Sequence, residues 1–342
     1  MKLRLKKLRD QTIVITGASS GIGLVTARSA ARHGARVVLN ARNEEALKQI
    51  VAEIRSLGGL GSYVVGDVAI LDEVKRIADG AVQMFGGFDT WINNAGVSIY
   101  GRVLDQSLDD HRRLFETNYW GMVHGSMVAC NYLRERGGAL INVGSVLSDR
   151  AIPVQGTYSA SKHAMKGYTD ALRMELEKEG IPISVTLVKP SAIDTPYIKH
   201  ARNLFSNEPL NPPPVYSPES VAEAILHCAQ HPEREIIVGG GGRFLSEFAH
   251  HAPRLTDKLM QATMFDLQRS GKAKAADHRD SLHFPTDGGQ ERGGYSGHVA
   301  ESSVYTRAAL HPWLVGLLIA GTGLAVINLW KSRSRDGEPE DD

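Results

Sequence analysis

Short apolar runs alternate with amphipathic stretches along roughly the first 240 residues. Runs rich in β-branched residues predict buried strands at residues 12–16, 36–40, 62–66, 90–93, 139–144, 183–188 and 235–238. The stretches between these runs carry apolar residues at helical spacing; the stripe that follows Tyr158 stops at Gly180. Strands that alternate with helices predict an α/β fold built on a doubly wound parallel sheet.

The turn after the first predicted strand is rich in glycine. Gly17, Gly21 and Gly23 stand between the apolar run TIVIT and an amphipathic helix. Small residues at such a turn let the backbone approach a pyrophosphate, and the helix amino terminus offers unpaired N–H groups to an anion. An ordinary glycine-rich turn has the same composition, but the order of strand, turn and helix favours a dinucleotide site.

The end of the second predicted strand bears on the choice of dinucleotide. A protein that binds NAD places an acidic residue there to contact the ribose 2′-hydroxyl, whereas this chain has Ala41 followed by Arg42. An arginine can neutralise a 2′-phosphate. The sequence therefore predicts NADP (NADPH) as cofactor rather than NAD; the alternative is an arginine that faces solvent.

Polar and small residues also follow the third and fourth predicted strands. Asp67 is suited to accept a hydrogen bond from an adenine amino group, with Val68 against the ring. The run Asn93–Gly96 comes at the carboxyl end of the fourth strand, where a doubly wound sheet holds its ligand. An asparagine turn that braces the central strand would use the same residues.

Residues 139–162 carry the candidate reaction centre. Tyr158 and Lys162 are four residues apart, so a helix that begins near Tyr158 places both side chains on one face. A positive charge beside a phenol favours the phenolate and lowers the tyrosine pKa, which is ordinarily about 10. Ser145 follows the preceding strand, and its hydroxyl can hold a substrate oxygen while Tyr158 gives or takes a proton. Alone, a serine in a turn and a tyrosine and lysine at this spacing are common by chance.

The helical stretch at about residues 109–136 is interrupted near Asn118. Asparagine is unfavourable within a helix because its side chain competes for backbone hydrogen bonds. A position that holds a water for a proton relay would explain this residue.

Composition narrows the range of functions. The 342 residues carry a formal net charge of +1, which argues against a general nucleic-acid binder. The two cysteines, Cys130 and Cys228, lack the spacing of metal ligands, so the sequence predicts no metal site. Two reduced, packed cysteines suit a reducing compartment.

With these residues in place, the first 240 or so residues resemble the short-chain dehydrogenase/reductase family. The motifs that carry the resemblance are TGASSGIG, Asp67–Val68, NNAG, Asn118, Ser145 and YSASK from Tyr158 to Lys162. The resemblance implies a Rossmann-like seven-stranded parallel sheet, bound NAD(P) and interconversion of a carbonyl and an alcohol. It also implies a homodimer or homotetramer packed through the two long central helices.

The resemblance further implies a role for each matching residue. Tyr158 would be the acid/base, and Lys162 would lower its pKa and hold the nicotinamide ribose. Ser145 would position the carbonyl, and Asn118 would hold a relay water. Together with Arg42, the expected cofactor-binding residues are Gly17, Ser19, Ser20, Gly21, Ile22, Gly23, Asp67, Val68, Asn94, Ala95, Gly96, Tyr158, Lys162, Pro190 and Thr195.

One departure from the family pattern lies beside the expected nicotinamide site. Ser191 follows Pro190 where many members have glycine, which puts the conformation of the loop over the nicotinamide in doubt. The segment from residue 191 to 217 is polar and rich in proline. A long loop inside a compact domain predicts a lid or a binding loop.

Beyond residue 240, the end of the predicted catalytic domain, the pattern changes. Residues 241–270 carry apolar residues at helical spacing, which predicts one or two amphipathic helices broken near Pro253. Covering the substrate cleft, packing on the domain and lying on a membrane surface are all compatible with this pattern. Residues 271–311 are rich in Gly, Asp, His and Ser without periodicity, and they predict a flexible linker.

The apolar run from Trp313 to Trp330 contains no charged residue. As a helix it would extend about 27 Å, close to the roughly 30 Å hydrocarbon core of a bilayer. The sequence therefore predicts a single-pass membrane anchor at residues 312–330, followed by a charged tail at 331–342. Basic residues after the run favour a cytoplasmic tail. The lack of an export signal favours a cytoplasmic catalytic domain instead, and we give this observation more weight.

Together these features predict a membrane-anchored, NADP-dependent oxidoreductase that interconverts a carbonyl and an alcohol by hydride transfer. The anchor favours a lipophilic substrate, as do the apolar residues expected near the site: Ile99, Tyr100, Val146, Leu147 and Ile152. The alternative is a non-catalytic, membrane-anchored redox sensor or scaffold that binds a dinucleotide. The complete set Asn118, Ser145, Tyr158 and Lys162 favours the enzyme, since a binding module has no need for a lysine beside the tyrosine.

Overall fold

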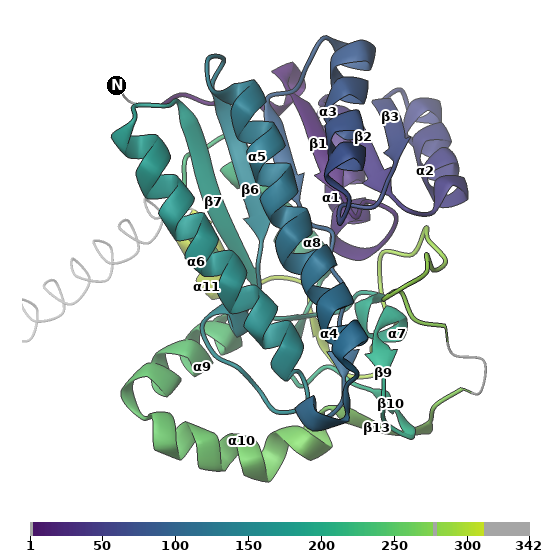
Figure 1. Cartoon of the computed structure of the whole chain (residues 1–342), viewed down its shortest axis with the longest axis vertical. Helices are drawn as coiled ribbons and strands as arrows, with labels where there is room; N and C mark the ends of the chain where they lie inside the picture. The colour runs from purple at the N-terminus through teal and green to yellow at the C-terminus, as the bar shows by residue number, and fades with distance from the viewer. Residues whose placement is uncertain (1–2, 276–278, 311–342) are drawn as a thin grey trace, which may run out of the picture.

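The computed structural model describes residues 3–275 and 279–310, and a seven-stranded sheet lies at its centre (Figure 1). The strand order is β12-β7-β6-β4-β1-β2-β3, and each neighbouring pair is parallel. The strands are β1 (Thr12–Thr16), β2 (Arg36–Ala41), β3 (Leu60–Val65), β4 (Thr90–Asn93), β6 (Gly138–Val143), β7 (Ile183–Pro190) and β12 (Glu235–Val238). The predicted α/β fold with a doubly wound parallel sheet is confirmed.

Helices cover both faces of the sheet, as expected when strands and helices alternate along the chain (Figure 1). One layer contains α1 (Gly21–Arg32), α2 (Glu44–Ser56) and α8 (Pro218–Cys228). The other contains α3 (Leu71–Phe85), α5 (Gly121–Leu133) and α6 (Gly156–Lys178). On β1, Ile13 and Ile15 belong to the first core and Val14 to the second, because successive strand residues point to opposite faces.

The strand order reverses between β1 and β4. From β1 the sheet continues through β2 to β3 on one side, and from β4 it continues through β6 and β7 to β12 on the other. Ligands of open α/β sheets bind at the carboxyl ends of the strands beside such a reversal. The glycine-rich turn and the NNAG run follow these two strands, so both lie at that edge.

Smaller elements surround this edge. The short strands are β5 (Ile99–Tyr100), β8 (Ala192–Ile193), β9 (Arg202–Asn203), β10 (Asn207–Pro209), β11 (Val215–Tyr216), β13 (Arg269–Ala273) and β14 (Val299–Ala300). The remaining helices are α4 (Leu108–Phe115), α7 (Tyr197–His200), α9 (Gly240–His251), α10 (Pro253–Leu267) and α11 (Val304–Leu310). Single helical turns occur at Leu8–Asp10, Val103–Asp105 and Val146–Ser148, and Glu116–Trp120 is π-helical. Helices α9 and α10 meet at Pro253.

Residues 279–300 differ from the predicted flexible linker. This segment crosses the sheet edge on a defined path, and its end, β14, pairs with β11. Leu282 and, farther on in α11, Leu310 are buried. The pattern could not reveal this arrangement, because most of the attachments use backbone groups, which leave no apolar periodicity in the sequence.

No helix within residues 3–275 and 279–310 is both long enough and apolar enough to cross a membrane. The predicted anchor at residues 312–330 and the tail at 331–342 lie outside the described residues.

Candidate active site

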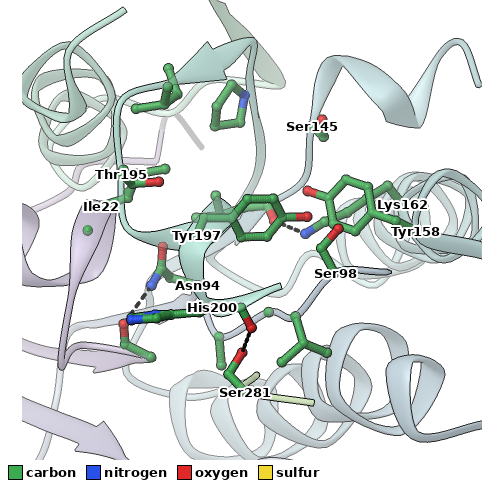
Figure 2. A pocket seen from close by; sticks show the side chains of 18 of the residues that line it. Ile22, Asn94, Ser98, Ser145, Tyr158, Lys162, Thr195, Tyr197, His200 and Ser281 are labelled. Atoms are coloured by element: carbon green, nitrogen blue, oxygen red, sulfur yellow. Dashed lines mark hydrogen bonds between the residues drawn. The ribbon is translucent and has the colours of Figure 1, made fainter. Parts of the chain in front are cut away.

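The structure brings Ser145, Tyr158 and Lys162 together at the end of β6 (Figure 2). Ser145 precedes the helical turn Val146–Ser148, and its Oγ accepts a hydrogen bond from Leu147 N at 3.1 Å. Tyr158 and Lys162 share the buried face of α6, and Lys162 Nζ lies 5.6 Å from the centre of the Tyr158 ring. The Ser145 hydroxyl lies near the Tyr158 phenol and lowers its pKa, against the larger effect of burial. Both hydroxyls therefore face one part of the pocket, where they can hold the same substrate oxygen.

Burial controls the charges of this pair. It raises the pKa of Tyr158, and the nearby hydroxyls of Tyr197 and Ser145 oppose this effect. It also lowers the pKa of Lys162 to about 7. Removing each charged form from water is the largest effect on both groups, and the expected lowering of the Tyr158 pKa by Lys162 stays a prediction. Tyr158 keeps its proton at neutral pH, which suits it to donate that proton to a carbonyl oxygen.

Lys162 has a defined partner at the base of the pocket. Its Nζ donates a hydrogen bond to the carbonyl oxygen of Val143, the last residue of β6, at 2.9 Å. The bond holds the ammonium group against the strand end and beneath the tyrosine ring. Lys162 is therefore positioned by the fold before any ligand is considered.

Asn118 lies in the π-helical turn between α4 and α5 and is fully buried. Its Oδ1 accepts a hydrogen bond from Val97 N at 2.8 Å, and its Nδ2 donates to Val97 O at 3.0 Å and Ser161 Oγ at 3.1 Å. The side chain thus ties the loop after β4 to α6. This structural role also explains an asparagine at the interruption, and the relay water stays a prediction.

Two glycines shape the turn after β1. A Cβ on Gly17, which has φ +64°, would lie 2.7 Å from Ala95 Cα, and one on Gly23 would lie 2.3 Å from Gly17 O. Both distances are too short for a side chain, so the close contact between the two strand ends requires glycine. Asn94 Nδ2 donates to the carbonyl oxygens of Thr16 and Gly17 at 3.0 and 3.1 Å. The asparagine therefore braces the turn, as the structural alternative predicts.

One pocket runs along the carboxyl edge of the sheet from Arg42 to Tyr158. It is also lined by most of the expected cofactor residues: Gly17, Ser19, Ser20, Gly21, Ile22, Asp67, Val68, Asn94, Ala95, Gly96, Lys162, Pro190 and Thr195. Gly23 and Asn118 do not line it; Gly23 packs behind the turn and Asn118 behind the loop after β4. An elongated pocket with a glycine cradle at its middle and an arginine at one end fits a dinucleotide.

Arg42 and Asp67 lie at the adenosine end of this pocket. Arg42 Nη2 donates to the carbonyl oxygens of Ser281 and Phe284, whereas its Nη1 is buried without a hydrogen-bond partner among the described residues. Burial lowers the pKa of Arg42, but an arginine keeps its charge at neutral pH. Asp67 forms an ion pair with Arg113 of α4. The unpartnered Nη1 fits a ligand with an anionic group at this end.

Several residues of the pocket had little or no signal in the sequence. Tyr197 begins α7, and its ring centre lies 5.6 Å from that of Tyr158 (Figure 2). Its position in the predicted binding loop, two residues after Thr195, was the available signal. Leu245 of α9 and Met264 of α10 also line the pocket, and both pack against the apolar cluster that contains Tyr158. Ser281, Pro285 and Thr286 line it from the segment predicted to be a linker.

Ser191 is accommodated by a run of glycines. Its Oγ donates to Gly239 O at 3.2 Å. A Cβ on Gly242 would lie 2.4 Å from the same Oγ, and one on Gly239 would lie 2.6 Å from it. Glycines in the facing segment therefore leave the space that the serine side chain needs.

Comparisons with known proteins agree with this geometry. The sequence model of the family described as short chain dehydrogenase matches residues 11–204. The chain belongs to the short-chain dehydrogenase/reductase family. It is therefore an NAD(P)-dependent oxidoreductase, and the expected enzyme class is confirmed.

A relative of almost the same length has been found in Bacillus subtilis (strain 168). The uncharacterised oxidoreductase YxnA is 45% identical over 323 residues, which cover 94% of this chain and 91% of that protein. Because 94% of the chain is covered, the similarity includes most of the residues beyond 240.

Two solved structures resemble the catalytic part. A short-chain dehydrogenase/reductase from Burkholderia phymatum in complex with NAD has a TM-score of 0.66 and 25% identity, over 75% of this chain and 96% of that one. An alcohol dehydrogenase from the archaeon Thermococcus sibiricus, complexed with 5-hydroxy-NADP, has a TM-score of 0.59 and 25% identity, over 67% and 95%. The two neighbours carry different dinucleotides, so they indicate the cofactor class and not the choice within it.

The lowered pKa of Lys162 predicts how stability depends on pH. Its folded value of about 7 lies below the ordinary 10.5, so between these values the unfolded chain binds more protons. The free energy of unfolding therefore rises with pH, and Lys162 contributes about 2 kcal/mol to the rise between pH 7 and pH 9. Urea denaturation at both pH values should show this rise in the native protein and a smaller one in Lys162→Met. Equal rises in the two proteins would contradict the burial argument.

Proposed function

We propose that the protein interconverts a lipophilic carbonyl compound and its alcohol, with NADP as cofactor. The observation that carries the proposal is the pocket itself. Its one end holds the facing hydroxyls of Ser145 and Tyr158, and its other end holds the cationic Arg42. A hydride carrier bound between these ends would have its nicotinamide beside the proton donor.

The chain's own residues account for the proton and the orientation of the substrate. When bound in this pocket, NADPH would supply the hydride that the carbonyl carbon gains. The Ser145 and Tyr158 hydroxyls donate hydrogen bonds to the carbonyl oxygen, and Tyr158 then gives that oxygen its proton. The protonated fraction of Lys162 stabilises the phenolate that remains. In the opposite direction the same phenolate accepts the proton of the alcohol.

The lining of the substrate end supports a lipophilic substrate. Val146, Leu147 and Ile152 from the loop after β6 line the pocket, and Tyr100 lies beside them. Leu245 and Met264 from the helical extension add further apolar surface. Ile99 is buried behind this surface and does not line the pocket. Apolar walls favour substrates that gain from leaving water.

Removal of the phenol hydroxyl tests the assignment of Tyr158. We expect Tyr158→Phe to lower the turnover of hydrophobic ketones and aldehydes by about 10²–10⁴-fold, because no positioned acid remains. NADPH binding should change little, since the ring and Lys162 stay in place. NADPH oxidation against a panel of carbonyl compounds measures the first quantity, and fluorescence titration measures the second.

Tyr168→Phe is the matched control, because Tyr168 lies on the same helix, outside the residues that line the pocket. Turnover that survives Tyr158→Phe would reject the mechanism. Tight NADPH binding by the native protein without turnover of any compound in the panel would favour the sensor or scaffold. Equal turnover of small polar carbonyls and lipophilic ones would count against the substrate class.

Replacement of Arg42 tests whether the protein prefers NADPH to NADH. Charge-assisted hydrogen bonds are worth about 1.5–3 kcal/mol, so Arg42→Met should weaken NADPH binding by about 10–100-fold. NADH binding should change less than about twofold, since NADH has no 2′-phosphate. Arg134→Met removes an exposed arginine at the end of α5 that lines neither this pocket nor the hollow beside Arg42, and it should affect neither cofactor. Equal losses for NADPH and NADH would show that Arg42 does not recognise the phosphate.

The uncharged run at residues 312–330 supports a single-pass membrane anchor with the catalytic domain in the cytoplasm. We expect the full chain to stay with membranes through an alkaline carbonate wash. A chain that ends at Leu310 keeps α11 and should be found in the supernatant. Release of the full chain by carbonate would contradict the anchor.

Helices α5 and α6 lie side by side on one face of the sheet (Figure 1). Exposed apolar side chains project from this region: Trp120, Met127 and Met174. This surface supports assembly into a homodimer or homotetramer, and sedimentation equilibrium of the full chain measures the state directly.

A further inference from the structure

Residues 279–295, here called the strap, run beside the dinucleotide pocket, and Ser281, Pro285 and Thr286 line it. Asp280 pairs with Arg202 at 3.2 Å, and Ser281 donates hydrogen bonds to His200 O from N at 2.7 Å and from Oγ at 3.0 Å (Figure 2). Leu282 is fully buried in the cluster that contains Tyr158. The strap is thus held at its start by a buried side chain as well as by polar contacts.

Three side chains hold the strap at the adenosine end. Arg42 donates to the carbonyl oxygens of Ser281 and Phe284, and Arg113 Nε donates to Leu282 O at 2.9 Å. Asn43, which caps α2, donates to Thr286 O at 3.0 Å. All the acceptors are backbone carbonyl groups, so the contact depends on the path of the strap more than on its side chains.

The strap also contacts the glycine-rich turn. Gly21 N donates to Gln290 O at 2.9 Å, and Gly289 N donates to Ser19 O at 2.8 Å. The hypothetical Cβ of Gly288 would lie 2.5 Å from Ala46 Cβ and 3.0 Å from Ser19 O. The strap therefore packs directly against the backbone expected to hold the pyrophosphate.

At the nicotinamide end the strap passes Thr195. The Asp194 carboxylate accepts hydrogen bonds from Gly293 N at 3.1 Å and Tyr295 N at 3.0 Å. A Cβ on Gly293 would lie 2.3 Å from Thr195 O. The strap thus follows the cofactor site from its adenosine end to its nicotinamide end.

We propose that the strap is the outer wall of the NADP site: it positions Arg42 for the 2′-phosphate and slows the release of the bound cofactor. The proposal rests on the proposed function, because it takes NADP as the ligand. Ser281, Pro285 and Thr286 line the same pocket as the glycine-rich turn.

The chemistry of the strap suits the positioning of an arginine. Its carbonyl groups orient Arg42 Nη2 without cancelling the charge, whereas a carboxylate in their place would compete with a phosphate. The buried Nη1 is left without a partner among the described residues, and it is the group available to an anion. Loss of the strap would leave a long side chain that samples many rotamers.

A wedge variant of the full chain tests the positioning. Gly288→Val places a branched side chain where even a Cβ is too close to α2 and the turn, so the strap must move away. We expect NADPH binding to weaken at least tenfold and NADH binding to weaken less, with faster NADPH release in stopped-flow fluorescence. Gly271→Val is the matched control, because a Cβ on Gly271 meets nothing within 4 Å.

A reversible lock tests the same proposal in the opposite direction, because a disulfide ties the strap to α2. Cysteines at positions 46 and 288 need a shift of roughly 1 Å to reach the Cβ separation of a disulfide, which is about 3.8 Å. In Ala46→Cys/Gly288→Cys preloaded with NADPH, release should be at least tenfold slower in the oxidised than in the reduced protein, and reduction should reverse the effect. The lock remains informative if the wedge variant fails to fold.

The proposal and the proposed function fail in different ways. Release rates that are the same in the oxidised and reduced double-cysteine protein would overturn the strap proposal and leave the enzyme reading intact. Wedge and control variants with equal NADPH affinity and release would do the same. A native protein that binds neither NADPH nor NADH would overturn the proposed function and, with it, the strap.

Discussion

The contact between the ends of β1 and β4 is the constraint on which the site depends. Thr16 Oγ1 accepts hydrogen bonds from Asn94 N at 3.0 Å and Ala95 N at 3.2 Å, while Gly17 lies directly against Ala95. These contacts hold together the two strands at which the sheet order reverses. The crevice that follows the reversal is therefore rigid on its inner side, and every candidate residue is placed relative to it.

Burial gives this crevice its chemistry. Low exposure keeps the proton on Tyr158 and brings the pKa of Lys162 to about 7, so a small change in environment shifts Lys162 between its two forms at neutral pH. The same enclosure at the other end leaves the cationic Arg42 guanidinium with one nitrogen that has no partner in the part of the chain that the structure describes. A ligand that carries an anion to Arg42 and a carbonyl partner to Tyr158 would satisfy both ends together.

The segments beyond residue 240 complete the pocket in two different ways. Helices α9 and α10 contribute apolar side chains to the substrate end, so the apolar faces of these amphipathic helices pack against the domain. The strap contributes backbone carbonyl and N–H groups to the cofactor end. The inner wall of the pocket belongs to the sheet. The strap forms its outer wall and can detach with a free energy of its own, separate from the unfolding of the sheet.

The sequence by itself determined the sheet, the glycine turn and the set Ser145, Tyr158 and Lys162, because their spacing along the chain is fixed by helix and strand geometry. It also located Arg42 at the end of a strand, because a strand end can be recognised from the residues next to it in the sequence. Only the tertiary structure decided the pKa of Lys162 and the bonding of Asn118, since burial depends on residues far away in the chain. It alone placed the strap, because backbone hydrogen bonds between distant segments leave no pattern in side-chain composition.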